Sequence, residues 1–186
     1  PPDAGPMQDS GPAFDAGPRV EGWQRKEPEA SPGSRGESAM AYDAVRGRIV
    51  LFGGGPGSGQ HAQGTWLWDG MDWREAQVET SPPARSQAAL AFDAPRGEIV
   101  LFGGYNGSGN LSDTWVWNGE AWSQKSPPQS PPARNQFAMT YDPLSARVLL
   151  FGGAQCSDGG CTLGDTWAWN GQGWAELQPT GGPTAG

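Results

Sequence analysis

Two cysteines are the only thiols of this 186-residue chain, and they lie close together in the segment QCSDGGC at 155–161. A zinc site would need four ligands, and this segment contains no histidine. Redox catalysis normally uses Cys-x-x-Cys at the start of a helix, with two intervening residues instead of four. We therefore expect a disulfide between Cys156 and Cys161 that closes a surface loop in an oxidising compartment.

Other residues that could support catalysis are sparse. His61 is the single histidine of the chain. The sequence shows no serine-nucleophile motif, no phosphate-binding loop and no paired carboxylates with catalytic spacing. We expect no catalytic residue, no metal and no cofactor.

Three arginines recur at spacings of 50 and 49 residues: Arg35, Arg85 and Arg134. Such a set could form an anion-binding ring, but a role repeated in every unit favours architecture. We expect each guanidinium to bond backbone carbonyls or a carboxylate of the adjacent unit. Asp113 and Asp165 are expected to make loop hydrogen bonds, and Gly64 stands at their position in the first unit.

Ten tryptophans could suggest carbohydrate stacking, but six of them fall at equivalent strand positions: Trp66, Trp68, Trp115, Trp117, Trp167 and Trp169. Equivalent positions in repeated units favour packing between the units. We expect these indoles to form the core.

These residues belong to three copies of one unit, at 31–80, 81–129 and 130–180, each with a diglycine: Gly53-Gly54, Gly103-Gly104 and Gly152-Gly153. Each copy predicts four short strands. In the second copy these are Gln87–Phe92, Glu98–Phe102, Asp113–Trp117 and a short strand around Trp122. The dipeptide Asn118-Gly119 predicts the last hairpin turn.

After each diglycine come two tryptophans with six residues between them: Trp66 and Trp73, Trp115 and Trp122, Trp167 and Trp174. This pattern resembles the kelch repeat, with tryptophan in place of the usual tyrosine. The resemblance covers 31–180 and implies an all-β fold, a β-propeller of kelch type with three four-stranded antiparallel blades.

A blade is apolar on both faces, so three blades alone would leave two end faces uncovered. We expect a ring of six or seven blades in the complete protein, or two chains that pair into one ring. Residues 21–30, with Trp23, are expected to form an orphan strand that closes the ring, and 181–186 to begin a truncated next repeat.

Residues 1–20 repeat Asp-(Ala/Ser)-Gly-Pro-x-x and are expected to form a disordered acidic linker. Its style resembles bacterial surface lipoproteins, which implies a lipid tether upstream. Together with the cysteines it favours an extracellular, cell-surface or periplasmic location.

The net charge of −8 makes nucleic acid a poor partner, and no apolar run reaches the roughly 20 residues that span a membrane. We expect a binding module for a protein or glycan, with self-association through uncovered blade faces. The loops at 55–64, 105–112 and 154–164 vary between the copies. Variable loops on a rigid scaffold carry recognition, so five loop residues are candidate contacts: His61, Gln63, Tyr105, Asn106 and Asn110. The alternative is a fragment of a carbohydrate-active enzyme similar to galactose oxidase, although the copper ligands of that enzyme have no counterparts here.

Overall fold

A computed structural model describes residues 22, 24–57, 59–155 and 161–178, and in this part of the chain every regular element is a strand. The strands are β1 (Ala39–Asp43), β2 (Arg48–Phe52), β3 (Thr65–Trp68), β4 (Trp73–Glu75), β5 (Ala89–Asp93), β6 (Glu98–Phe102), β7 (Thr114–Trp117), β8 (Trp122–Lys125), β9 (Ala138–Asp142), β10 (Arg147–Ala154), β11 (Thr162–Trp169) and β12 (Trp174–Leu177). The all-β prediction is confirmed.

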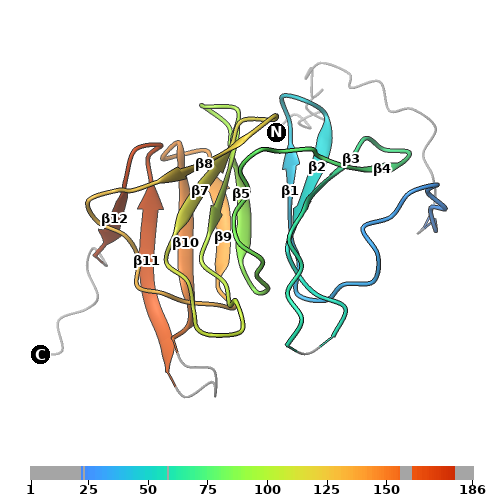
Figure 1. Ribbon diagram of the computed structural model, residues 1–186. Coiled ribbons are helices and arrows are strands. Elements are labelled where there is room, and N and C mark those ends of the chain that lie inside the picture. The colour runs from blue at the N-terminus through green and yellow to red at the C-terminus, as the bar shows by residue number, and fades with distance from the viewer. Residues whose placement is uncertain (1–21, 23, 58, 156–160, 179–186) are drawn as a thin grey trace, which may run out of the picture.

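The strands form three separate four-stranded sheets, each an antiparallel meander in chain order. The sheets stand side by side, and their first strands, β1, β5 and β9, lie next to one another (Figure 1). The first strand of each blade is therefore the innermost one, and the fourth lies at the outer edge. Three four-stranded antiparallel blades are what the kelch-type repeat predicts.

Local sequence explains each blade. The second strand of blade 2 is apolar from Ile99 to Phe102 and fully buried, because neighbouring blades cover both of its faces. In the turn between β7 and β8, the side chain of Asn118 accepts hydrogen bonds from the backbone N–H of Glu120 and Ala121 at 2.9 and 2.8 Å. The predicted hairpin is present, but its two central residues are Gly119, with φ of +102°, and Glu120, because the N–H of Asn118 donates to Ala121 O at 3.2 Å.

The diglycine that ends β6 brings two backbones together. Gly104 has φ of +99°, and a Cβ there would lie only 2.6 Å from the carbonyl oxygen of Ser86. Only glycine meets both requirements, so the diglycine recurs in every blade.

Adjacent blades pack through tryptophans of the fourth strands. The Nε1–H of Trp122 in blade 2 donates to Thr65 Oγ1 of blade 1 at 2.8 Å, and its ring meets Phe52 edge-on with centroids 5.6 Å apart. Trp174 of blade 3 repeats both contacts on Thr114 and Phe102 of blade 2, at 2.9 and 5.4 Å.

The predicted core role of the indoles holds fully in blades 2 and 3, where Trp115, Trp117, Trp167 and Trp169 are buried. It holds only in part in blade 1. There Trp66 and Trp68 are half-buried, because no blade covers that side of the sheet in the described structure.

The third loop, predicted at Ala154–Gly164, is partly strand, since Gly153 pairs with Leu163 and Ala154 with Thr162. Residues 24–30 lie outside the strands, and the N–H of Ala30 donates to Asp72 Oδ1 at 2.9 Å. Ring closure by 21–30 stays a prediction. The linker 1–20, Trp23, Cys156 and the segment 181–186 lie outside the described residues, so the predictions made for them are untested.

Candidate binding face at the diglycine end

All three variable loops lie at the end of the blades where the second strands reach their diglycines. We call this end the loop face. It comprises the described residues of the loops 53–64, 103–113 and 152–161, together with the segments that lead into each blade at 34–38, 84–88 and 133–137.

Buried arginines hold the loop face of blades 2 and 3 in place. Arg85 is fully buried; its Nη1 donates to Gly103 O at 2.9 Å and to Asp113 Oδ1 at 2.6 Å, and its Nη2 donates to Asp113 Oδ2 at 2.8 Å. Asp113 also accepts the Nε1–H of Trp115 at 2.7 Å. Burial alone would raise the pKa of Asp113, but the hydrogen bonds and charge of Arg85 outweigh it, so the pKa lies below its ordinary value.

Blade 3 has the same arrangement. Arg134 donates to Gly152 O at 2.9 Å and bonds both carboxylate oxygens of Asp165 at 2.7 Å. The hydrogen bonds from Arg134 lower the pKa of Asp165 to about 2. The predicted bonds to backbone carbonyls are confirmed, whereas a carboxylate from the adjacent blade is wrong, because Asp113 and Asp165 belong to the arginines' own blades.

Contact with the adjacent blade runs through the arginine backbone instead. The N–H of Gly54 in blade 1 donates to Arg85 O of blade 2 at 2.9 Å, and the N–H of Gly104 donates to Arg134 O at the same distance. Each arginine therefore links its own loop to the diglycine of the preceding blade.

In blade 1 the carboxylate is missing, because Gly64 occupies the position of Asp113. Arg35 donates to Gly53 O at 3.1 Å and to Pro32 O. Its pKa is lowered by burial, against which the charge of Glu75 acts. The carboxylate of Glu75, at the end of β4, thus lies near the position that Asp113 occupies in blade 2.

Two residues after each arginine, the backbone takes a left-handed conformation, with φ of 57°, 57° and 53° at Glu37, Gln87 and Gln136. The N–H of Gln87 donates to Glu37 O at 2.9 Å and the N–H of Gln136 to Gln87 O at 3.2 Å. The backbone is thus the same in all three blades, while the side chain is glutamate in blade 1 and glutamine in blades 2 and 3. Sequence reasoning missed these residues, although their fixed offset from the arginines was a usable signal.

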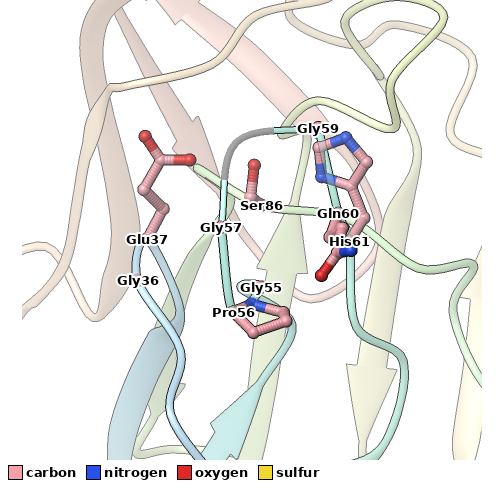
Figure 2. A pocket seen from close by; sticks show the side chains of 9 residues that line it. All are labelled: Gly36, Glu37, Gly55, Pro56, Gly57, Gly59, Gln60, His61 and Ser86. Carbon is pink, nitrogen blue, oxygen red and sulfur yellow. The ribbon is translucent and has the colours of Figure 1, made fainter.

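A pocket of about 350 Å³ opens on the loop face between blades 1 and 2. Figure 2 shows Glu37 on one side of it, His61 on the other, and Ser86 between them. Glycines line much of the rest: Gly36, Gly55, Gly57 and Gly59. The pocket therefore exposes backbone together with a carboxylate, a hydroxyl and an imidazole.

His61 packs edge-on against Tyr105 of blade 2, with ring centroids 5.6 Å apart. Both of its ring nitrogens are buried and have no hydrogen-bond partner within the described residues. The hydrogen-bonding capacity of the imidazole is therefore unused at the wall of the pocket.

A family model for the KLHDC2/KLHL20/DRC7 Kelch-repeats domain matches residues 18–186. The chain belongs to the Kelch-repeat family. No individual curated protein gives a significant match. Membership of this family indicates a protein-interaction module.

The five predicted contact residues of the Kelch chain separate into two groups. His61 lines the pocket, and its ring contacts that of Tyr105. Gln63 instead donates to Pro82 O at 3.1 Å, and Asn106 accepts two backbone N–H groups of its own loop. Asn110 donates to Ala154 O and Gln155 O at 3.0 and 2.8 Å and so joins the loops of blades 2 and 3.

Within the described part of the chain, no three residues among His, Cys, Asp and Glu gather as a metal site would require. The same residues contain no helix long and apolar enough to cross a membrane. The Cys156–Cys161 disulfide stays a prediction, since Cys156 is not described.

Proposed function

We propose that this Kelch chain is a non-catalytic module that binds a partner protein through its loop face, with the pocket between blades 1 and 2 at the centre of the contact. The observation that carries the proposal is the contrast within each repeat. Arginine, diglycine and backbone geometry are constant, whereas the loops at 53–64, 103–113 and 152–161 differ in every blade, and the left-handed position is glutamate in blade 1 but glutamine in blades 2 and 3. Constant positions build the scaffold and variable ones suit recognition.

A protein partner fits better than a glycan. Sugar binding sites commonly use exposed aromatic faces, but all six tryptophans of blades 2 and 3 are buried in packing contacts, with Trp117 and Trp169 only 1% exposed. The pocket offers a carboxylate and polar backbone, which suit hydrogen bonding to a peptide.

The proposal extends to location. The predicted disulfide of Cys156 and Cys161 and the acidic linker at 1–20 support an extracellular, cell-surface or periplasmic setting. The enzyme alternative gains no support from the described residues, because Glu37 and His61 stand on opposite sides of the pocket and no three metal-ligating side chains gather there.

The test is selection of binding peptides from a displayed random library, followed by affinity measurement on variants. Glu37→Ala and His61→Ala should each weaken the selected peptides about tenfold, as loss of a central contact does. Glu120→Ala is the matched control, because Glu120 is an exposed carboxylate in the β7–β8 turn at the opposite end. Peptides that bind all three variants as tightly as the unmodified chain would place recognition elsewhere and refute the proposal.

A further inference from the structure

Each joint between blades has two halves. The forward half, on the earlier blade, presents a phenylalanine at the end of the second strand and a threonine at the start of the third. The backward half, on the later blade, presents the tryptophan of the fourth strand and apolar residues of the first strand. Phe52 and Thr65 receive Trp122, and Phe102 and Thr114 receive Trp174.

Blade 3 carries a forward half with nothing on it in the described structure. Phe151 is 56% exposed, whereas its counterparts Phe52 and Phe102 are 1% and 0% exposed. Thr166 is half-buried, although Thr65 and Thr114 are buried in their joints.

Blade 1 carries the matching backward half, also uncovered. Met40 and Tyr42 of β1 are 56% and 59% exposed, while Leu90, the counterpart of Met40 in blade 2, is 6% exposed. Trp73 is half-buried, although Trp122 at the same position is buried.

We propose that a second copy of the chain occupies these faces, with blade 1 of each copy docking on blade 3 of the other. Both halves of one joint are present on the same chain, so two copies related by a two-fold axis form two identical joints and leave no end uncovered. The proposed contact repeats the interface that the chain already forms twice, between blades 1 and 2 and between blades 2 and 3. The proposal is independent of the loop face, which lies at the ends of the strands.

One element of the internal joints is missing from the proposed one. Arg46 of blade 1 donates from Nη1 to Gly97 O of blade 2 at 2.9 Å and packs over Gly119, where a Cβ would overlap the guanidinium. Arg96 lies in the same way over Gly171 of blade 3. Blade 3 has Ser145 at this position, and its hydroxyl donates to Asp142 Oδ2 at 2.6 Å instead.

Gly70 of blade 1, the counterpart of Gly119, has open space where a Cβ would stand. The substitution Ser145→Arg would therefore place a guanidinium over Gly70 of the other copy. The joint between copies keeps the aromatic contacts and lacks the cation, so it should be weaker than the internal joints and dissociate on dilution.

Sedimentation velocity of the chain over a concentration series at micromolar protein tests the proposal. A dimer that dissociates on dilution is expected. Phe151→Glu and Met40→Glu should each give a monomer, because each places a charge in a dry joint. Gln124→Glu is the control, since Gln124 is exposed on β8, the outer strand of the middle blade and away from both free faces, and it should leave the dimer intact.

Mixing and gain-of-contact experiments separate a lost joint from a misfolded variant. An equimolar mixture of Phe151→Glu and Met40→Glu retains one unaltered joint and should associate into a pair. Ser145→Arg should lower the dissociation constant of the dimer about fivefold or more, the range of a charge-assisted hydrogen bond.

A chain that stays monomeric throughout the series would overturn the proposal and leave the two faces to further blades of a longer protein. Open assemblies of three or more copies would overturn two-fold closure. A mixture of the two variants that fails to associate would also count against it.

Discussion

Blades 1 and 2 follow one sequence plan, yet the same positions play different parts in the two blades. In blade 2 both faces are covered, and Arg85 is fully buried against the carboxylate of Asp113. In blade 1 one face is uncovered in the described structure, and Arg35 is only half-buried, with Gly64 in place of the aspartate. The contribution of a repeated residue to stability therefore depends on its neighbours and not on its position in the repeat.

The difference has two separate sources. One is local, because Gly64 removes a carboxylate and its φ of +113° disfavours restoring one. The other is tertiary, because no described residue supplies Trp73 with a phenylalanine and a threonine, as Phe52 and Thr65 do for Trp122. Single substitutions can therefore test the missing carboxylate and the uncovered face separately.

The largest expected difference concerns the arginines. Arg85→Ala should lower the free energy of unfolding by about 3–5 kcal/mol, because it leaves the carboxylate of Asp113 partly buried without its cation. Arg35→Ala should cost only about 1 kcal/mol, because no aspartate is left behind in blade 1. Urea unfolding followed by tryptophan fluorescence measures both values. Equal costs would mean that the carboxylate contributes nothing to the contrast.

Low pH should reduce the stability of blade 3 through Asp165, because blade 1 has Gly64 at the equivalent position. The pKa of Asp165 is about 2 in the folded chain, below its ordinary value of 3.8, so its stabilisation is present above about pH 4 and is lost as the pH falls toward 2. The full contribution is about 2 kcal/mol. The gap in unfolding free energy between the unmodified chain and Asp165→Asn should therefore shrink between pH 7 and pH 2.5.

Asp165 keeps its side chain 19% exposed, so solvent reduces this value only moderately. Asp113, whose pKa is also lowered, should behave in the same direction in the Asp113→Asn variant. A gap that does not change with pH would contradict the lowered pKa of Asp165.

The smallest expected difference concerns the threonines of the joints. Thr65→Val leaves the buried Nε1–H of Trp122 without its acceptor and should cost roughly 1–2 kcal/mol. Thr166→Val is the same substitution at the same repeat position in blade 3, where no tryptophan among the described residues donates, and should change the stability of the monomer by less than about 0.5 kcal/mol. Thermal unfolding at a concentration that favours the monomer gives the comparison. Equal effects would show that strand preference, not the hydrogen bond, determines the cost.

Much of the architecture followed from recurrence in the sequence. The diglycines at a fixed spacing and the hairpin signal at Asn118-Gly119 predicted three antiparallel four-stranded blades, because close backbone approach and positive φ need glycine wherever they occur. The extension of β10 and β11 into the third loop was not predicted, since short polar segments carry little strand signal until a partner strand lies beside them.

The binding face was predicted less well. Variable loops suggested His61 and Tyr105, which do meet, but also Gln63 and Asn110, which bond the neighbouring loops instead. Whether a polar side chain is available to a partner depends on the carbonyl groups that surround it, and these come from other blades.

By itself the sequence determined the number of blades, their strand order and the constant scaffold positions, because local periodicity and turn chemistry act between residues close together in the chain. Only the tertiary structure decided which carboxylate pairs with Arg85, which indoles are covered, and which loop side chains face the pocket. Those outcomes depend on contacts between residues far apart in sequence, whose distances are fixed only when the blades stack.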